Sequence, residues 1–417
     1  MSHQAYQPSL NDILPKSILD TDLYKFTMQN AVLANFPDVH AVYRFTNRNK
    51  DSTFFSRDCF DRFQMAISQF DQIKLTPTER DWLSKTCPYF PSEYIDYLEN
   101  YRFKPEQVQA DFVPVDGING HIEITAAGPW AETILWEVPL MACLSEIYFT
   151  TTDTDWNYDK QEELAYQKGK ALLDAGCVFS EFGTRRRRSF HTQDLVVKQL
   201  VKASQDVSTG KVTGTSNVYL AQKYGILPIG TVAHEWFMGI GALRGYESVN
   251  ELALEMWETN YPNATLLALT DTFSTEAFFL SFSKNPARAK KWHGLRQDSG
   301  DPLVFAPRAK EIYEKMGIDH REKMIIYSDA LNLDKALKLK KQADEIGFKA
   351  SFGIGTFLSN DFAKVSDPHS KSPALNMVIK LAEVNGKVCV KISDDLTKNT
   401  GDKRVVDQVK HLFGLPL

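Results

Sequence analysis

The sequence predicts an α/β protein built on an irregular β/α barrel, with an N-terminal α+β domain and a small C-terminal α/β extension. Between residues 151 and 358, about seven short apolar runs are each followed by a polar turn and a helical pattern, which is typical of a parallel sheet. The 417 residues are enough for two or three domains. We expect these domains at 1–150, 151–358 and 359–417, the last packed on the first two. An open doubly wound sheet is the alternative to the barrel.

The first domain begins with a polar segment, residues 1–16, that we expect to be a flexible lead. Ile18–Phe36 is predicted to be a helix, because its apolar and small residues recur at spacings of three and four and Asp20 or Thr21 can cap it. Val108–Val115 and His121–Ala126 are strand-like, and the Asp-Gly and Asn-Gly pairs between them indicate a hairpin.

The barrel strands are predicted from apolar runs, each of which leads into a short polar loop rich in Gly, Ser, Thr, Asp or Arg. These runs are Cys177–Phe182, Lys211–Thr213, Ile226 to Trp236 (which contains the motif GTVAHEW), Thr265–Leu269, His293–Arg296, Met324–Tyr327 and Lys349–Phe352. Helices such as Asp159–Ala175 and Leu333–Ile346 separate them and close with glycine. Because ligands bind at the carboxyl ends of parallel strands, we expect the polar turns to converge on one mouth.

The tail has a different pattern. Val378–Glu383 and Lys387–Ile392 are alternating runs joined by Asn385-Gly386, which is a strong hairpin signal, and Val405–Phe413 is predicted to be a helix. The tail is either a small appended domain or a return to the first one.

Composition favours a cytoplasmic enzyme. Hydrophobic residues make up 43% of the chain and charged residues 24%, as in ordinary globular proteins. The net charge of -5 argues against general nucleic-acid or acidic-membrane binding. Five cysteines without CxxC spacing indicate reduced thiols and no cysteine-based zinc site. No apolar stretch is long enough to span a bilayer, and the polar N-terminus does not resemble a secretory signal.

His234 is the main candidate for chemistry, because it follows an apolar run and a small-residue turn. A histidine among apolar neighbours is commonly structural. The His-Glu pair lacks the second histidine that a zinc protease needs. General base, metal ligand and nucleophile all stay open for His234, and Asp271 could orient its ring.

The other loops offer groups that suit phosphates and ribose. Gly353, Gly355 and Thr356 can present backbone N–H groups to an anion, and Ser299-Gly300-Asp301 is a second such loop. Walker A and GxGxxG motifs are both missing from the sequence. The acids at strand ends can hold ribose hydroxyls or a divalent metal, or can simply cap helices; they are Asp271, Asp298, Asp301 and Asp329, the last of which follows Ser328. We expect one or two of the four arginines at 185–188 to reach substrate anions.

At these motifs the chain closely resembles nicotinate phosphoribosyltransferase, a type II phosphoribosyltransferase, especially its yeast-like and enterobacterial branch. The matching stretches run in order from Leu19 to the tail: LDTDLYKFTMQ, AGPW, SEFGTRRRR, GTSN, GTVAHEW, ALTDTF, GLRQDSGDP, YSDALN, FGIGT and LNMVIKL. The family often has SGPW where this chain has AGPW.

The resemblance implies an activity and a set of roles. The family makes nicotinate mononucleotide and pyrophosphate from nicotinate and phosphoribosyl pyrophosphate (PRPP), with ATP as co-substrate and Mg²⁺ as cofactor, at the start of nicotinate salvage into NAD. His234 matches the histidine that becomes phosphorylated, with Asp271 as its expected partner. The remaining matches are Tyr24 and Phe182 around the pyridine ring, Arg185, Thr231 and Arg296 around nicotinate and phosphates, Asp298 and Asp329 near the ribose, and Gly353, Gly355 and Thr356 at the 5′-phosphate. Gly300, Asp301 and Ser328 are also expected to bind substrate. Ser216 stands where the nicotinamide enzyme carries an aspartate, so it favours the acid over the amide.

Several alternatives stay open. The chain could be a nicotinamide or quinolinate phosphoribosyltransferase, or a barrel lyase or isomerase that acts on a sugar phosphate with His234 as general base. A nucleic-acid binder is disfavoured by the net charge. We expect no membrane partner and either a monomer or a homodimer, with Tyr24 supplied by the same chain or by a neighbouring subunit.

Overall fold

Seven parallel strands form the central sheet of the computed structural model, which describes residues 6–395 and 399–416. The strands are β5 (Val178–Glu181), β6 (Lys211–Thr215), β7 (Leu227–Pro228), β8 (Leu267–Leu269), β9 (Gly294–Gln297), β10 (Met324–Tyr327) and β11 (Lys349–Ile354). Their order is β7-β6-β5-β11-β10-β9-β8. Within the described ranges no ladder joins β7 to β8, so the sheet is a curled half-barrel, and the predicted irregular β/α barrel is confirmed.

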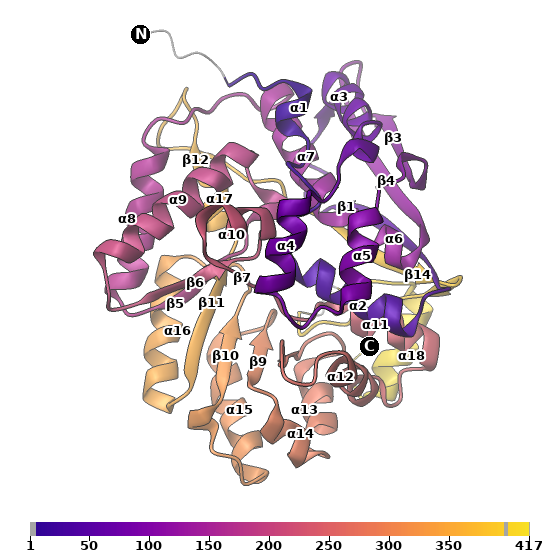
Figure 1. Cartoon of the computed structure of the whole chain (residues 1–417), viewed down its shortest axis with the longest axis vertical. Helices are drawn as coiled ribbons and strands as arrows, with labels where there is room; N and C mark the ends of the chain where they lie inside the picture. The colour runs from indigo at the N-terminus through magenta and orange to yellow at the C-terminus, as the bar shows by residue number, and fades with distance from the viewer. Residues whose placement is uncertain (1–5, 396–398, 417) are drawn as a thin grey trace.

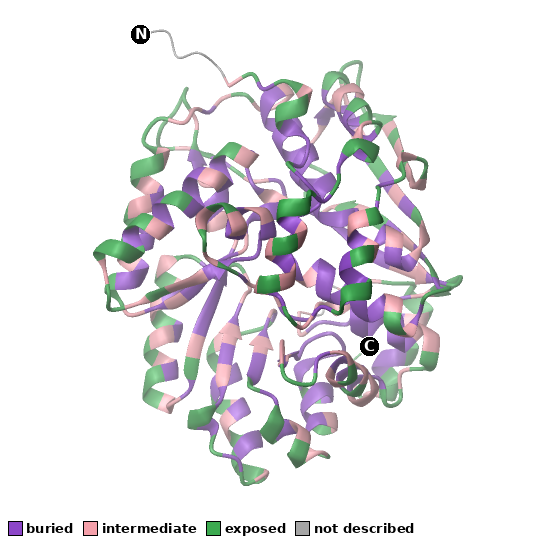
Figure 2. Ribbon diagram, viewed as in Figure 1, coloured by how far each residue is buried: buried purple, intermediate pink, exposed green. Residues whose placement is uncertain are grey.

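Helices precede, separate and follow these strands, and several of them cover the outer face of the sheet (Figure 1). They are α8 (Gln161–Asp174), α9 (Phe190–Asp206), α10 (Val218–Tyr224), α11 (His234–Arg244), α12 (Val249–Asn260), α13 (Thr275–Phe282), α14 (Pro286–Lys291), α15 (Pro302–Lys315), α16 (Leu333–Ile346) and α17 (Thr356–Ser359). Figure 2 shows mostly buried strands and exposed outer faces on α15 and α16. In the part of the chain that the structure describes, no helix has the length and apolar character needed to cross a membrane.

Helix α16 illustrates how the sequence produces these elements. Asn332 caps its N-terminus by accepting from the backbone N–H of Lys335, and the helix ends at Gly347, whose φ of 104° favours glycine. Ala336, Leu339 and Ala343 are buried at spacings of three and four, so one stripe faces the sheet. Truncation of a buried leucine such as Leu339 to alanine costs about 2–5 kcal/mol.

The prediction of a strand through GTVAHEW is wrong in its extent, because the observed strand is much shorter. Only Leu227–Pro228 pairs with the sheet, and Leu227 is 56% exposed. Pro228 has no N–H to continue a ladder, and β7 is an edge strand. The chain then passes the start of α2, where a Cβ on Gly230 would lie 2.8 Å from the backbone N of Tyr24. His234 therefore begins α11 rather than ending a strand.

An antiparallel sheet forms the N-terminal part. Its strands are β1 (His40–Asn47), β2 (Phe55–Ser56), β3 (Val108–Pro114) and β4 (Asn119–Pro129), and the predicted hairpin is the β3–β4 pair. The helices around it are α1 (Leu10–Ile13), α2 (Leu23–Asn35), α3 (Arg57–Ile67), α4 (Pro77–Thr86), α5 (Ser92–Asn100), α6 (Trp130–Thr133) and α7 (Glu137–Thr151), and the short 3-10 turns there are Phe70–Gln72 and Pro105–Gln107.

Two expectations for this part need correction. Helix α2 starts at Leu23 instead of Ile18, because Asp22 bridges to Asn217 and the Leu23 N–H donates to the carbonyl of Ser216. The segment before it is not a flexible lead over the residues that the structure describes, since Ile13 is fully buried. Residues 1–5 of that lead lie outside the described residues.

The tail returns to the N-terminal sheet. Strand β14 (Met377–Val384) pairs antiparallel with β1, and Figure 1 shows the two side by side. It forms the predicted hairpin with β15 (Lys387–Val388) through Asn385-Gly386. The other tail elements are β12 (Phe362–Ala363), β13 (Lys371–Ser372) and α18 (Lys403–Leu412), the predicted terminal helix. The domain limits at 150 and 358 stay predictions.

Candidate active site

His234 lies at the carboxyl-terminal edge of the parallel sheet among charged side chains from three segments. Its Nδ1 is 3.0 Å from Oγ1 of Thr272, and its Nε2 is 3.0 Å from both Oδ2 of Asp298 and Nζ of Lys391. Burial lowers the pKa of His234 and Lys391 lowers it further, although Asp271 and Asp298 oppose both effects. The ring is therefore neutral near pH 7, which a nucleophilic nitrogen requires.

A chain of hydrogen bonds extends from Asp298 across the strand ends. Ser328 donates to Oδ1 of Asp298 at 2.6 Å and accepts from Nε of Arg296 at 2.9 Å. Arg296 also donates to Oγ1 of Thr231 at 3.1 Å. Burial would raise the pKa of the Asp298 carboxyl, but Arg296 and His234 hold it well below its usual range. The structure thus brings five predicted residues together.

Asp271 lies deeper than Asp298 and is fully buried. Its Oδ2 accepts from Oγ of Ser299 at 2.5 Å, and its Oδ1 is 3.9 Å from Nε2 of His234. The groups within hydrogen-bond distance of the imidazole are thus Thr272, Asp298 and Lys391, and Asp271 acts on the ring through its charge. Lys391 Nζ is 3.7 Å from Oδ2 of Asp271.

Tyr24, Arg185 and Ser216 meet where α2 enters the half-barrel. Tyr24 comes from the same chain as the strand-end loops, and its hydroxyl and the Arg185 guanidinium are close enough to affect each other's pKa. The Ser216 hydroxyl is fully buried and donates to Oδ1 of Asp22 at 2.7 Å. Burial raises the pKa of the Asp22 carboxyl, against the hydrogen bond from Ser216. Ser216 is therefore held by Asp22 inside the protein and is not exposed to solvent.

The predicted glycine loops differ in what they contact. A Cβ on Gly353 would lie 3.4 Å from the ring of half-buried Phe182, and one on Gly355 would lie 3.1 Å from the Phe182 carbonyl. Thr356 is half-buried and begins α17. At the second loop, Gly300 has φ +75° and lies against Asp394, while Asp301 caps α15 by accepting from the Leu303 N–H.

The other predicted acid, Asp329, is half-buried beyond β10. Its charge acts on Arg48, which comes from the N-terminal sheet. The carbonyl oxygen of Asp329 accepts from Nζ of Lys335. Asp329 therefore lies on the side of the mouth that the N-terminal sheet faces.

Cations from the N-terminal part and the tail, which sequence reasoning missed, join two of the predicted arginines in one cluster. This cationic cluster consists of Arg48, Arg185, Arg186, Lys380 and Lys391. Burial, followed by Arg48 and Lys391, lowers the pKa of Lys380 to about 8, and burial followed by Arg185 lowers the pKa of Arg186 to about 9. The available signal was a single lysine inside each apolar run, as in MVIKL and VKI. The cluster is suited to an anion with several charges.

Arg187 and Arg188 have structural roles. Arg187 pairs with Asp20 at 2.7 Å, and both side chains are buried. Arg188 donates to Asn360 and Ser372, and its guanidinium carbon lies 3.5 Å from the centre of the Phe149 ring. Of the four arginines, Arg185 and Arg186 belong to the cationic cluster.

His234, Asp271 and Asp298 each offer a ligand atom, and these atoms lie within 4.8 Å of one another. Asp271 Oδ1 is buried without a hydrogen-bond partner. Mg²⁺ prefers carboxylate oxygens, so the oxygens of Asp271 and Asp298 fit this ion.

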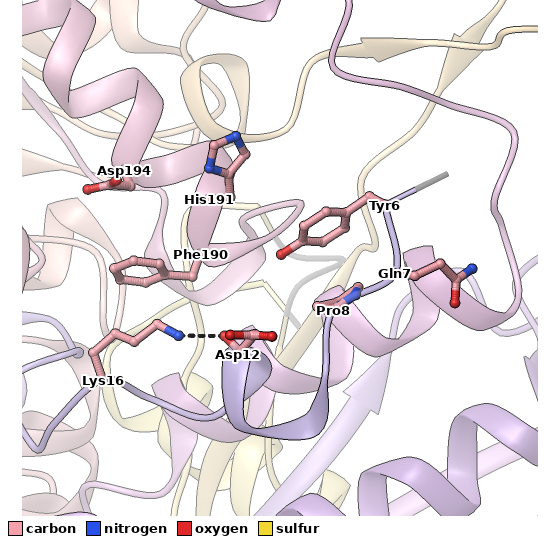
Figure 3. Close-up of a pocket in the computed structure, with 8 residues that line it drawn as sticks. All are labelled: Tyr6, Gln7, Pro8, Asp12, Lys16, Phe190, His191 and Asp194. Carbon is pink, nitrogen blue, oxygen red and sulfur yellow. Dashed lines mark hydrogen bonds between the residues drawn. The ribbon is translucent and has the colours of Figure 1, made fainter. Parts of the chain in front are cut away.

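A surface hollow of about 470 Å³ lies elsewhere, beside the first described residues. Figure 3 shows Tyr6 and Phe190 facing it from different segments, with Lys16 bonded to Asp12 on one side. The residues that line it are Tyr6, Gln7, Pro8, Asp12, Lys16, Phe190, His191 and Asp194, and none of them is a predicted site residue.

The strand ends of the half-barrel hold a neutral histidine, two carboxylates, a cationic cluster and glycine turns. This combination indicates an α/β enzyme that acts on phosphorylated substrates. Profile comparison specifies the family: the Nicotinate phosphoribosyltransferase (NAPRTase) family profile matches residues 177–417, and the profile of its N-terminal domain matches 19–145. The chain belongs to the nicotinate phosphoribosyltransferase family, as the sequence motifs predicted.

Relatives cover nearly the whole chain. A probable nicotinate phosphoribosyltransferase of Schizosaccharomyces pombe is 43% identical over 405 residues, 96% of this chain and 98% of that protein. A nicotinate phosphoribosyltransferase of Methanosarcina mazei is 44% identical, with the same coverage. The crystal structure of a putative nicotinate phosphoribosyltransferase of Saccharomyces cerevisiae superposes with a TM-score of 0.93 at 40% identity, over 99% of this chain and 100% of that chain.

Proposed function

We propose that this protein makes nicotinate mononucleotide and pyrophosphate from nicotinate and PRPP, the first step of nicotinate salvage to NAD, and that it couples this reaction to ATP hydrolysis through a phosphohistidine at His234. The observation that carries the proposal is the neutral Nε2 of His234 beside Lys391 and Asp298, in a chain of this family. The cytoplasmic location and the monomeric or homodimeric state stay predictions.

The nicotinate pocket is proposed at Tyr24, Phe182 and Arg185. An aromatic side chain orients a pyridine ring by stacking, and the Arg185 side chain, 39% exposed, can bind a carboxylate. The pyridine nitrogen then attacks C1 of the ribose as the bond to pyrophosphate breaks. Fixing the ring before attack lowers the entropic part of the barrier.

The leaving pyrophosphate would face the cationic cluster, and the 5′-phosphate would lie at Gly353–Thr356. Arg48 and Lys380 neutralise the leaving group without reorganisation, which is the most effective electrostatic arrangement. Asp271 and Asp298 would hold Mg²⁺, which would supply further charge neutralisation for the departing pyrophosphate.

Phosphorylation supplies the link to ATP. Nε2 of His234 attacks the γ-phosphorus, the bond from phosphorus to the bridging oxygen breaks, and ADP leaves. Lys391 stabilises the charge that develops on the phosphoryl oxygens. The phosphohistidine carries about −1.5 to −2 charges, and water later hydrolyses it to the neutral histidine and phosphate.

Pyrophosphate release from PRPP tests the activity, with nicotinate or nicotinamide and with or without ATP. We expect release with nicotinate that is faster with ATP. Release with nicotinamide alone would indicate the sister enzyme, and release with neither would favour a sugar-phosphate lyase or isomerase. An acid-labile, base-stable phosphate on wild type but not on His234→Ala tests the phosphohistidine, and equal labelling of both proteins would exclude it.

A further inference from the structure

Four charged side chains connect the proposed nicotinate pocket to the helix that carries His234. Lys25 of α2 lies between two carboxylates, with Nζ 2.5 Å from Oε2 of Glu137 and 2.7 Å from Oε1 of Glu235. The other carboxylate oxygen of Glu137, Oε1, is 3.4 Å from Nη1 of Arg185. Glu235 directly follows His234 in the first turn of α11.

The centre of this chain is sealed from solvent. The Lys25 side chain is fully buried, and both glutamates are 9% exposed. Burial lowers the pKa of Lys25, but the two glutamates together raise it above its usual value, so Lys25 is charged. Arg185 and Lys25 balance Glu137 and Glu235, and a nearby change of charge acts strongly on Lys25 because water does not reach this ammonium.

Each glutamate shares Lys25 with the other, so their two ion pairs compete. A ligand carboxylate on Arg185 would draw the guanidinium from Glu137 and strengthen the attraction of Glu137 for Lys25. The pair of Lys25 with Glu235, at the start of α11, would weaken in proportion. A dianionic phosphate beside Glu235 would act on the same ammonium from the other end.

We propose that Lys25 is a positioning residue that couples nicotinate binding at Arg185 to ATP binding beside His234, through its shared ion pairs with Glu137 and Glu235. The inference rests on the proposed function, in which Arg185 holds nicotinate and His234 accepts phosphate. Coupling between two binding sites is reciprocal, so ATP must change nicotinate affinity by the factor with which nicotinate changes ATP affinity.

Calorimetry on the full chain measures this coupling directly. The coupling factor is the ratio of the nicotinate dissociation constants without and with a non-hydrolysable ATP analogue and Mg²⁺. We expect about tenfold coupling in wild type, within the usual range for linked sites, and less than about twofold in Glu235→Gln. Each ligand alone should bind the variant within about threefold of wild type.

Two further variants separate coupling from lost stability. Lys25→Gln/Glu235→Gln removes one charge of each sign, which leaves no unpaired buried charge, and should also lose the coupling. Glu258→Gln breaks another ion pair, with half-buried Arg288 at 3.0 Å in the outer helices, and should keep the coupling. Thermal melting checks that all three variants are folded.

The result decides between the inference and the proposed function. The inference is overturned if Glu235→Gln and Lys25→Gln/Glu235→Gln both keep a coupling factor within twofold of wild type. It is also overturned if Glu258→Gln loses as much coupling as these two variants. Wild type that forms phosphohistidine without any coupling overturns it as well, while leaving the proposed function in place. Wild type that shows coupling but makes no nicotinate mononucleotide contradicts the proposed function alone.

Discussion

Nζ of Lys391 lies 3.0 Å from Nε2 of His234, although 157 positions separate the two residues. Lys391 reaches the histidine because β14 joins the N-terminal sheet and the following segment returns to the barrel mouth, where the N–H of Ile392 donates to the carbonyl of Thr272. The tail therefore completes the candidate active site.

Replacing Lys391 with methionine should abolish most of the ATP effect. The ammonium lowers the pKa of His234 and faces the nitrogen that would accept phosphate, so its loss removes stabilisation of the phosphoryl oxygens. We expect ATP-dependent labelling of His234 to fall about 10²–10³-fold, measured by quenched-flow with radioactive ATP. The exposed Lys387→Met serves as control. Labelling within threefold of wild type would show that Lys391 does not take part.

The stability of the protein should fall between about pH 4.5 and 7 because of Glu146. Burial raises the pKa of this carboxyl to about 7, although Arg187 and the Phe190 N–H oppose the change. Between the ordinary pKa of a glutamate and pH 7, the folded state keeps the Glu146 proton that the unfolded state has released. The contribution of Glu146 to the free energy of unfolding is therefore complete at low pH and is lost as the pH rises through 7. The shift corresponds to about 3 kcal/mol.

Glu146→Gln should remove the Glu146 contribution, since the amide cannot ionise, while Glu181, whose pKa burial also raises to about 7, keeps its own contribution in both proteins. Urea unfolding at pH 5 and pH 8 measures the difference in unfolding free energy between the two proteins. Relative to wild type, the unfolding free energy of Glu146→Gln should be higher at pH 8 than at pH 5. Glu123→Gln, a change at an exposed residue of β4, should show no such difference. An unchanged pH profile in Glu146→Gln would place the titrating group elsewhere.

Ser216→Asp should shift preference from nicotinate towards nicotinamide. The new carboxylate would lie against Asp22, within the buried pair that Ser216 now forms, and would add negative charge under the pocket of Arg185. We expect kcat/KM for nicotinate to fall at least about tenfold, and that for nicotinamide to fall less. Ser216→Ala is the matched control, because it removes the hydrogen bond without adding charge. An equal fall with both substrates in Ser216→Asp would contradict the role in selectivity.

The sequence predicts the half-barrel and its strand-end residues well, because both follow from local pattern. Apolar runs, polar turns and glycine stops alternate in order, and parallel strands bring their carboxyl ends to one edge. Thr231, Arg296, Asp298 and Ser328 are consequently both predicted and observed together.

Residues that depend on long-range docking escape the pattern. Arg48 directly follows β1 and Lys380 lies in the paired strand β14, more than 300 positions away, and nothing local indicates that their sheet faces the barrel mouth. The Ser216 environment is equally hidden, since its partner Asp22 is 194 positions away. The start of α2 and the short β7 were mispredicted for the same reason: tertiary contacts overrode local propensity.

Arg48 offers the sharpest test of the cationic cluster, because it lies outside every predicted loop. Burial lowers its pKa and Arg185 lowers it further, which places the two cations close together. Such repulsion is relieved when an anion binds, so Arg48→Met should raise KM for PRPP at least about tenfold and reduce its dependence on salt. Initial rates at 50 and 300 mM salt measure both effects. Arg44→Met, in β1 shortly before Arg48 and paired with Glu383, is the control and should leave KM within about twofold of wild type. If both variants raise KM equally, the effect comes from general surface charge and the cluster does not bind the pyrophosphate.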